Sequence, residues 1–466
     1  MRRLPTACLL VLAACPGKHH NSSPVTQPAC ATPVRGSVLP PEMVQDLGTL
    51  QVGADATFVV TTGTSSFFIF SQEVDGSAPD SVFVDERPDF IGNIPNAVVP
   101  TNLVDPDGTL WYDDVTEWIN LNSAIDGSSF LAYEVSAQSV SEAFPVPNTS
   151  GALAKIASDG GVKPGTWHFT VNDWARQCPF TGCADGNTSS RYRVQVVTRA
   201  ASASPTLDLE VYLATDPTSP LATAAAADAH PQVARWKDAL ALYLSQAEIA
   251  LGTVHFNDLP QDVKDARAPN GSVDITDGGP CGNLSQLFTS ATVPNRAVHL
   301  FLADEILAPT SSGTDAQIVG VDGSIPGPSG FPGTINGGAI VGLFGEFGFE
   351  AIRGACSGTV PNLACGTDVL AYIAAHEIGH WLGLYHTTES NGAAFDPISD
   401  TDRCPCSLCG GSSCGTANAF VLASQCRAPS SCGGGSNLMF WLLDDFSAGD
   451  LSPQQKQIVQ LNPAVR

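Results

Sequence analysis

A histidine-rich stretch, residues 374–390, constrains this chain more than any other feature of its sequence. Within it, residues 376–386 hold three histidines and one glutamate at fixed spacing: His376, Glu377, His380 and His386. Residues 368–384 have helical periodicity and contain no proline, so His376 and His380 lie four residues apart on one face of a predicted helix. Gly383 predicts the end of this helix, because glycine readily adopts the left-handed conformation that turns the chain. The turn would bring the third histidine back toward the first two.

This spacing predicts a zinc site with an adjacent base. Three neutral imidazoles, those of His376, His380 and His386, bind zinc and leave one position open for water, which is the arrangement of a catalytic site. Glu377 lies beside them and is placed to take a proton from that water as it attacks a carbonyl. The alternative is a helix that is merely rich in histidine, and the five fixed positions argue against it.

The size and charge of the chain limit the remaining possibilities. With 466 residues it is too long for one compact core, so we expect two or three domains. Lys and Arg number 21 against 46 Asp and Glu, which gives a formal net charge of −25. Such a surface repels phosphate backbones, so nucleic acid is excluded as an expected partner.

The N-terminus predicts export. Residues 1–15 combine two arginines, a short apolar run and the sequence Leu-Ala-Ala-Cys, and they resemble a bacterial lipoprotein signal peptide in which Cys15 becomes the lipidated first residue. An ordinary cleaved signal peptide is the alternative. No later apolar run reaches the ~20 residues that span a bilayer. We therefore expect a protein at the cell surface or outer membrane that contacts the membrane only through a lipid anchor, or one that is released.

The cysteines agree with an oxidising compartment. Of 14 cysteines, Cys8 lies in the signal and Cys15 would carry lipid, which leaves an even number for disulfides. Short separations favour two local pairs, Cys178 with Cys183 and Cys356 with Cys365. Six further cysteines lie in residues 404–432. We expect disulfides there with the pairing left open, and a metal cluster is the alternative.

The chain divides into four predicted regions. After the signal, residues 16–40 are a flexible, Pro-rich spacer. Residues 41–204 contain short strand-like runs broken by Gly, Pro, Asn and Asp, which predict an all-β sandwich-like domain. This domain has no catalytic constellation, so a binding role or a folding-assistant role is expected. Residues 205–466 follow a linker at 199–205.

The pattern of residues 205–466 predicts an α/β (α+β) domain. The expected elements, in order, are a strand at 207–215, a helix at 232–251, strands at 297–305 and 337–344, and a helix at 368–384.

Several motifs resemble a known family. The HExxHxxGxxH pattern is similar to the zinc signature of the metzincin metallopeptidases, and "SNLMFW" resembles their Met-turn, with Met439 as its methionine. More narrowly, "HEIGHWLGLYHT", "DPISDTD", "NLMFW" and "LSPQQKQIV" resemble the pappalysin family in order and spacing. The resemblance implies a metzincin-like catalytic domain with a twisted sheet, an active-site helix and a Met-turn. It covers roughly residues 206–466.

The resemblance also implies further site residues. It makes residues 337–344 the edge strand that binds an extended substrate by β-augmentation, through Gly338, Ala339, Ile340 and Val341. It implies calcium near the loop after the third histidine, with ligands from Asp396, Asp400, Thr401 and Asp402. An Asp/Ser-rich turn without metal is the alternative. One departure is Trp441, which stands where family members commonly have a tyrosine.

The sequence therefore predicts an exported zinc-dependent endopeptidase that acts on protein or peptide substrates, with Zn2+ as cofactor and with Ca2+ as a second cofactor that the resemblance implies. One alternative is a surface lipoprotein adhesin or binding module with a vestigial peptidase domain, which the intact Glu377 argues against. Another is a zinc hydrolase of different specificity, such as an amidase. The sequence leaves activation open: a thiolate from Cys30 could cap the zinc in a latent form, but a disulfide or a residue without a role is the favoured alternative for Cys30. It also leaves the oligomeric state open.

Overall fold

The computed structural model describes residues 32–74, 97–112, 130–131, 141–174, 190–275, 280–308, 316–343, 356, 365–410, 414, 420–427, 432–442 and 449–466. The predictions for Cys15, Cys30, Cys178 and Cys183 lie outside these residues. Within them, no helix combines the length and apolar character needed to cross a membrane.

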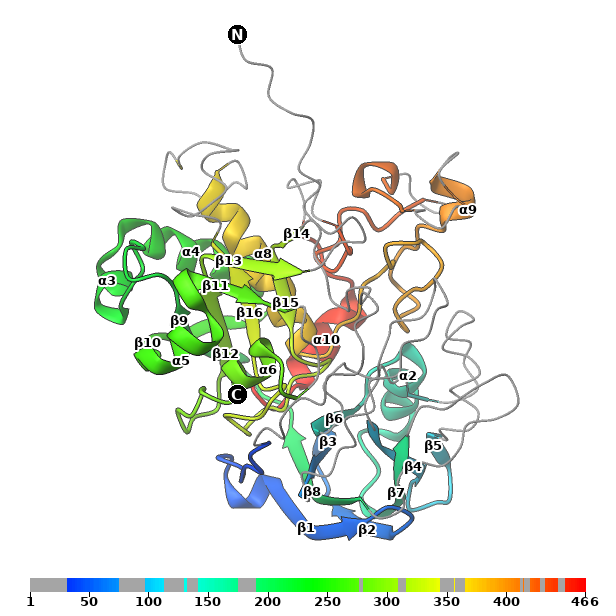
Figure 1. Cartoon of the computed structure of the whole chain (residues 1–466). Coiled ribbons are helices and arrows are strands. Elements are labelled where there is room, and N and C mark those ends of the chain that lie inside the picture. The colour runs from blue at the N-terminus through cyan, green and yellow to red at the C-terminus, as the bar shows by residue number, and fades with distance from the viewer. Residues whose placement is uncertain are drawn as a thin grey trace, which may run out of the picture.

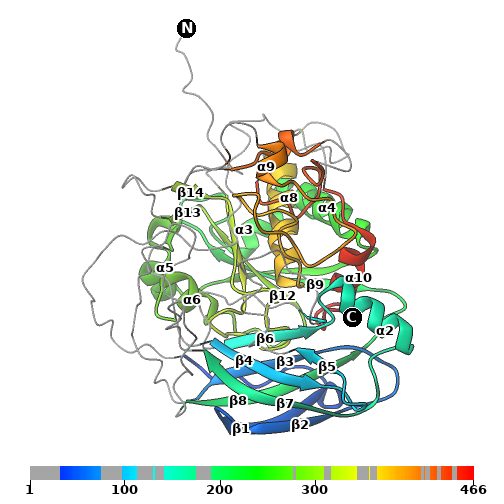
Figure 2. The same ribbon diagram turned by 90° about the vertical axis from the view of Figure 1, so that its right-hand side faces the viewer.

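Two four-stranded antiparallel sheets form the N-terminal part of the described structure (Figure 2). In spatial order, the first contains β1 (Val44–Gln51), β8 (Arg191–Ala200), β3 (Thr64–Glu73) and β6 (Ser141–Val146). The second contains β2 (Asp55–Val60), β7 (Gly165–Trp174), β4 (Ala97–Val104) and β5 (Leu110–Tyr112). A short η1 (Pro41–Met43) precedes them, and α2 (Ser150–Asp159) follows β6.

The two sheets share one aromatic core. In β2, exposed and buried residues alternate strictly, as expected of a strand with one solvated face. Phe58 from β2 and Phe67 from β3 meet with ring centroids 5.0 Å apart, and Trp167 from β7 lies 5.0 Å from Phe67. These side chains come from both sheets, so the sheets pack face to face as a sandwich.

A five-stranded sheet forms the centre of the C-terminal part (Figure 1). Its order is β10 (Ala250–Asp258), β9 (Thr206–Ala214), β12 (Val298–Ala303), β16 (Ala339–Gly342) and β15 (Gly320–Asp322). Only β15 runs antiparallel to its neighbour. A second, three-stranded sheet contains β11 (Ser272–Asp274), β13 (Glu305–Ala308) and β14 (Ala316–Ile318). The described structure is thus a mixed α/β arrangement with several sheets.

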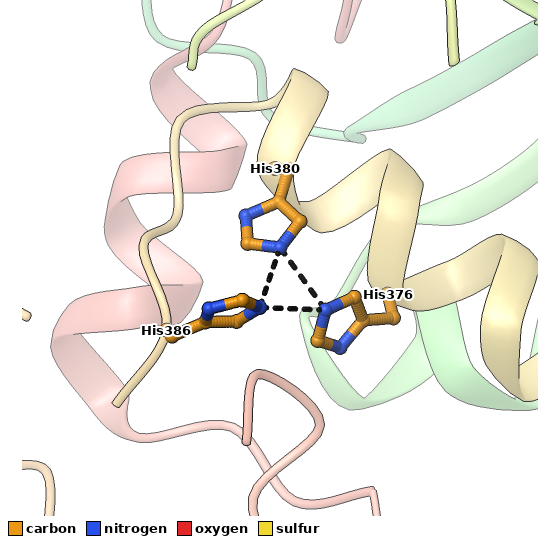
Figure 3. A group of neighbouring side chains, drawn as sticks. All are labelled: His376, His380 and His386. Carbon is orange, nitrogen blue, oxygen red and sulfur yellow. Dashed lines mark hydrogen bonds between the residues drawn. The ribbon is translucent and has the colours of Figure 1, made fainter. Parts of the chain in front are cut away.

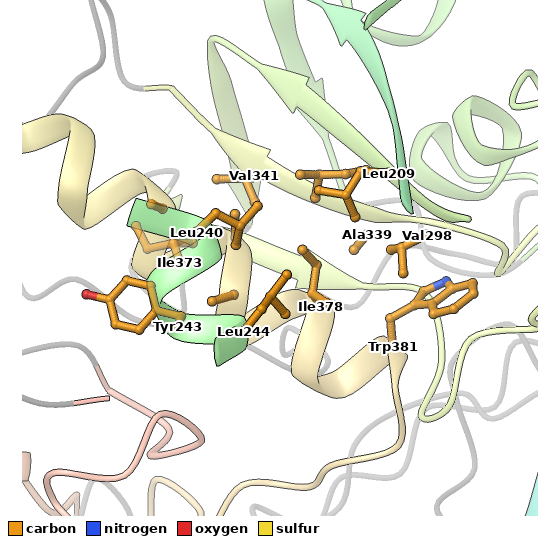
Figure 4. Packing of buried hydrophobic residues seen from close by; sticks show 14 of the residues in the cluster. Leu209, Leu240, Tyr243, Leu244, Val298, Ala339, Val341, Ile373, Ile378 and Trp381 are labelled. Carbon is orange, nitrogen blue, oxygen red and sulfur yellow. The ribbon is translucent and has the colours of Figure 1, made fainter. Parts of the chain in front are cut away.

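Helices cover both faces of the five-stranded sheet. The helices of this part are α3 (Ala224–Ala229), α4 (Pro231–Gln246), α5 (Gln261–Arg267), α6 (Asn283–Phe288), α8 (Gly366–Trp381), α9 (Cys406–Cys409) and α10 (Pro453–Leu461), with short turns at η2 (Pro269–Gly271) and η4 (Ala423–Gln425). Helices α4 and α8 pack on one face, where Leu240 and Ile378 meet Leu209 and Val341 of the sheet (Figure 4). Helices α5 and α6 contribute to a separate cluster on the other face.

One predicted helix is shorter than expected. The helical pattern of residues 232–251 predicts a helix to Leu251, but α4 ends at Gln246. Ala250 and Leu251 instead begin β10 and pair in parallel with Thr206 and Leu207 of β9. Helix propensity is local, whereas this pairing partner lies far away in the sequence and overrides it.

The two parts of the chain contact each other through the C-terminal segment. Arg199, at the end of β8, donates from Nε to the carbonyl oxygen of Val465 over 2.9 Å. Ser66 of β3 donates from Oγ to the carbonyl of Leu461 over 2.6 Å. The sandwich therefore contacts the end of α10 and the residues beyond it through hydrogen bonds to main-chain oxygens.

A buried ion pair ties α4 to α8. Arg235 of α4 donates from Nε to Oδ1 of Asp368 over 2.8 Å and from Nη2 to Oδ2 over 2.9 Å. The side chain of Asp368 is fully buried and that of Arg235 is 11% exposed. Removing one partner would leave a buried charge without compensation.

We predict that Arg235→Ala lowers the free energy of unfolding by about 3 kcal/mol, because the remaining carboxylate of Asp368 loses its charge partner. Lys237→Ala, two residues along the same helix, is the control. Its ion pair with Asp228 is exposed and 3.7 Å long, so we expect a loss below about 1 kcal/mol. Denaturant unfolding of both variants provides the measurement, and equal losses would contradict a special role for the buried pair.

Candidate metal centre

Helix α8 carries the first two histidines and the glutamate. Every residue of this helix is buried, so its polar side chains are shielded from bulk solvent. It ends at Trp381, and Gly383 reverses the chain with a φ of 111°. The amide of Gly383 donates to the carbonyl of His380 over 2.8 Å, which completes the helix end as the sequence predicts. The chain then returns His386 to the helix.

The three histidines converge through their Nε2 atoms (Figure 3). The Nε2–Nε2 distances are 3.0 Å between His376 and His380, 3.2 Å between His380 and His386, and 3.3 Å between His376 and His386. Three ligands of a tetrahedral zinc at about 2.0–2.1 Å would lie about 3.3–3.4 Å apart. The cluster could therefore hold a metal ion, and its size is compatible with zinc.

The other ring nitrogens establish which tautomer each histidine has. Nδ1 of His376 lies 2.6 Å from the carbonyl oxygen of Leu438, and Nδ1 of His380 lies 2.7 Å from that of Leu384. A carbonyl oxygen only accepts, so each Nδ1 carries the hydrogen and each Nε2 presents a bare lone pair. Lone pairs facing one another in a buried space repel unless a cation lies between them. This donor set fits a divalent metal.

Burial keeps the imidazoles of His376 and His380 neutral. Burial, together with the neighbouring imidazole of His386, lowers the pKa of His376 to about 3. Burial, together with the two neighbouring histidines, also lowers the pKa of His380 well below its usual value. Because only a neutral imidazole binds a metal, both groups are ready to act as ligands at neutral pH.

Glu377 lies beside the histidines with neither carboxylate oxygen hydrogen-bonded to a described residue. Its side chain is fully buried, and this burial raises its pKa well above that of an exposed glutamate. Gly320 of β15 makes room for it, since a Cβ at that position would collide with Oε1. An unpartnered buried carboxylate next to a metal-binding cluster has the properties of a general base.

The segment containing Met439 passes close to the cluster. Met439 is fully buried, and its carbonyl accepts from the amide of Thr387 over 2.9 Å. The preceding carbonyl, that of Leu438, is the partner of His376. The segment that resembles a Met-turn therefore contacts both the helix and the chain just beyond the third histidine.

Trp441 faces away from this chemistry. Its indole Nε1 donates to the carbonyl of Val421 over 2.8 Å, and its ring packs in a cluster with Cys404 and Cys426. Its only polar hydrogen is therefore already bonded. Trp441 therefore packs against the cysteine-rich segment.

The predicted substrate edge strand is wrong. Gly338–Val341 was expected at the edge of the sheet, but β16 lies between β12 and β15 and pairs with both. The outer strand on this side is β15, which pairs with Ala339, Ile340 and Val341 of the predicted substrate strand. The sequence pattern identified a strand but not its neighbours, which are set by contacts far away in the sequence.

The three aspartates predicted to bind calcium do not form a cluster that could share an ion. Among the described residues, two groups of three or more candidate side chains lie close enough to share an ion, and neither includes Asp396, Asp400 or Asp402. Asp400 accepts from Oγ of Ser452 over 2.6 Å and from the amide of Gln454 over 3.0 Å, at the start of α10. Both of its oxygens thus stabilise a helix N-terminus. The other group is Cys356, Cys365 and Asp368, in which the two cysteines form a disulfide.

Asp396 and Thr401 do meet. Oγ1 of Thr401 donates to Oδ1 of Asp396 over 2.6 Å, while Oδ2 has no partner among the described residues. Burial raises the pKa of Asp396 to about 8 from 3.8. The folded state therefore keeps a proton that the unfolded chain releases, so this group makes stability fall as pH rises from about 4 to about 8.

We predict that Asp396→Asn removes this pH dependence while keeping an oxygen for Thr401. The melting temperature of the variant should rise relative to the wild type as pH increases from about 4 to about 8. Melting curves across this range test the prediction, and a difference independent of pH would contradict it. Added calcium is the control, because a cation bound by Asp396 would stabilise the wild type at pH 8 and not the variant.

Four disulfides join described cysteines: Cys356–Cys365, Cys404–Cys426, Cys406–Cys414 and Cys409–Cys432. The first is the local pair expected from the sequence, and the others resolve the pairing left open for residues 404–432. Cys281 is also disulfide-bonded, as the even number of remaining cysteines predicts.

Two contributors to the site were also missed. Glu389 lies 3.0 Å from Nδ1 of His386, and its position three residues after that histidine was an available local signal. Gly320 had no such signal, because its contact with Glu377 depends on the pairing of distant strands.

Comparison with known proteins adds little to this geometry. No protein family matches the chain, and no curated protein matches it. Among solved structures, metalloproteinase-II from Bacteroides fragilis is similar, with 11% sequence identity and a TM-score of 0.25. The match covers 58% of this chain and 62% of that chain, which is less than two thirds of its length. A similarity at this level says nothing about function, so a function can be inferred only from the geometry of the site.

Proposed function

We propose that this chain is an exported zinc-dependent endopeptidase. The observation that carries the proposal is the convergence of three bare Nε2 lone pairs beside the unpartnered carboxylate of Glu377. The ligands of the zinc would be His376, His380 and His386. A purely structural zinc site normally has four protein ligands and needs no adjacent base.

The residues have distinct roles in this proposal. Zinc supplies, when bound, a Lewis acid that polarises a carbonyl and acidifies water. Glu377 accepts the proton of the attacking water at a carboxylate oxygen and donates it to the leaving nitrogen of the peptide bond. Its burial favours both steps, because a carboxylate whose pKa lies nearer neutrality both gains and releases a proton readily.

A peptide substrate fits the edge of the sheet. β15 is the outer strand of the five-stranded sheet, and Gly320 of this strand contacts Glu377. An extended peptide could add to such an edge through main-chain hydrogen bonds. The three histidines and Glu377 are at most 2% exposed, so productive binding requires movement of the residues that cover them.

Export and lipid anchoring at Cys15 remain proposals from the sequence. The disulfides of the described structure support an oxidising compartment. The net charge of −25 argues against nucleic acid as a partner. A zinc hydrolase of another specificity uses the same constellation, and a digest of a peptide library alongside amidase substrates would separate the two activities.

We predict that His380→Ala loses zinc, whereas Glu377→Gln retains it and loses activity. The first variant removes a ligand, and the second removes only the proton acceptor, which typically contributes about 10²- to 10⁴-fold to the rate. Metal analysis and a protein-digestion assay of the purified chain provide the measurements.

The assay should include the protein before and after limited proteolysis, because the site is buried. Equal zinc content in the wild type and His380→Ala would show that the site is misassigned. A zinc-loaded wild type that cleaves no protein or peptide in either form would favour the vestigial alternative.

We further predict that Gly320→Ala keeps its zinc and loses about 10²-fold or more in turnover, because the added methyl group displaces the carboxylate of Glu377. Gly36→Ala is the matched control, since a Cβ there meets nothing within 4 Å. Zinc content, circular dichroism and turnover should be measured together. A folded, zinc-loaded Gly320→Ala protein with wild-type turnover would contradict the proposed placement of the base.

A further inference from the structure

The three imidazoles are oriented by two kinds of partner. His376 and His380 each donate from Nδ1 to a main-chain carbonyl oxygen, at 2.6 and 2.7 Å. His386 instead faces a side chain, because its Nδ1 lies 3.0 Å from Oε1 of Glu389. The third ligand is thus the one whose orientation depends on a carboxylate.

The turn that carries Glu389 is held in place by its own backbone. The amide of Glu389 donates to the carbonyl of Ala394 over 2.9 Å, and the carbonyl of Glu389 accepts from the amide of Gly392 over 2.8 Å. The backbone of this residue is therefore fixed from both sides. The carboxylate needs only its own side-chain torsions to reach the imidazole.

A disulfide-linked segment supports this turn. Gly392 has a φ of 61°, and a Cβ there would lie 2.6 Å from the amide nitrogen of Cys406, so the turn and Cys406 are in close contact. The amide of Cys406 donates to the carbonyl of Gly392 over 3.1 Å, and Cys406 is bonded to Cys414. The position of Glu389 is therefore set by a covalently braced part of the chain.

We propose that Glu389 is the positioning residue for the third zinc ligand. By accepting the Nδ1 hydrogen, its carboxylate fixes the tautomer and the ring orientation that point Nε2 of His386 at the metal. A carboxylate in this place also makes the imidazole a stronger donor to a cation. The inference rests on the metal site of the proposed function and extends it to a residue outside the zinc signature.

The partial exposure of Glu389 separates a role in positioning His386 from a role in stabilising the fold. Its side chain is 37% exposed, and an ion pair or hydrogen bond at such a position contributes little to folding. The buried partner is the imidazole, which is 2% exposed. Loss of the carboxylate should therefore affect metal binding far more than the stability of the metal-free protein.

Three variants of the full chain test the proposal. Glu389→Ala removes the acceptor, Glu389→Gln retains an acceptor oxygen without the charge, and Asn391→Ala is the matched control in the same turn. Asn391 accepts from the amide of Ala393 over 2.8 Å and makes no hydrogen bond to the imidazole within the described part of the chain. Zinc affinity by competition with a chelator, the visible spectrum of the cobalt-substituted protein and the melting temperature of the metal-free protein are measured for each.

Glu389→Ala should bind zinc about 10- to 100-fold more weakly and change the cobalt spectrum, with the metal-free melting temperature unchanged. Glu389→Gln should recover most of the affinity, and Asn391→Ala should match the wild type. Wild-type affinity and spectrum in Glu389→Ala would overturn the proposal. So would an equal loss in Asn391→Ala, or a metal-free Glu389→Ala protein that melts well below the wild type, since either assigns the effect to the turn. A wild type that binds no zinc would instead refute the proposed function itself.

Discussion

Three imidazole lone pairs converge in a space without bulk solvent, and this convergence limits how the surrounding chain can be arranged. A buried polar group is costly unless it is hydrogen-bonded, so each Nδ1 hydrogen needs its own acceptor. The carbonyl of Leu438 serves His376, that of Leu384 serves His380, and Glu389 serves His386. These acceptors come from three different parts of the chain. The three histidines can converge only if α8 is buried, the chain turns at the end of α8, and the segment before Met439 lies against the helix.

The β-sandwich contributes to this arrangement as a scaffold. The amide of Ser150, at the start of α2, donates to the carbonyl of Pro397 over 3.2 Å, and its Oγ accepts from the amide of Ser399 over 2.7 Å. Asp400 in the same loop bonds the N-terminus of α10, whose Ile458 packs near the turn at Gly383. The sandwich therefore supports the loop beyond the third histidine and, through α10, the end of helix α8. A sandwich that served only as a detached binding module would have no need of these contacts.

The sequence predicted what depends on local spacing. The positions of His376, Glu377 and His380 on one helix follow from a period of four residues, and the stop at Gly383 follows from the conformational freedom of one glycine. Features that depend on distant partners were not predictable in the same way. The placement of β16 inside the sheet requires knowledge of β15, and the end of α4 is decided by the pairing of β10 with β9. The aspartates after the third histidine have the composition of a calcium loop, yet Asp400 bonds a helix start that composition cannot reveal.

The segment between His386 and Met439 shows how the site can include a long excursion of the chain. Residues 387–438 separate His386 from Met439 in the sequence, and bringing the two ends of such a segment together costs conformational entropy that grows slowly with its length. Three disulfides join cysteines within this segment, and each restricts the conformations that the segment can adopt in the unfolded chain. Cys404–Cys426 joins the chain soon after the third histidine to the chain soon before the Met439 segment. Because the amide of Cys404 also donates to Oγ1 of Thr388, the covalent link continues by a hydrogen bond to within two residues of His386. The cysteine-rich segment therefore helps to hold the candidate metal centre together.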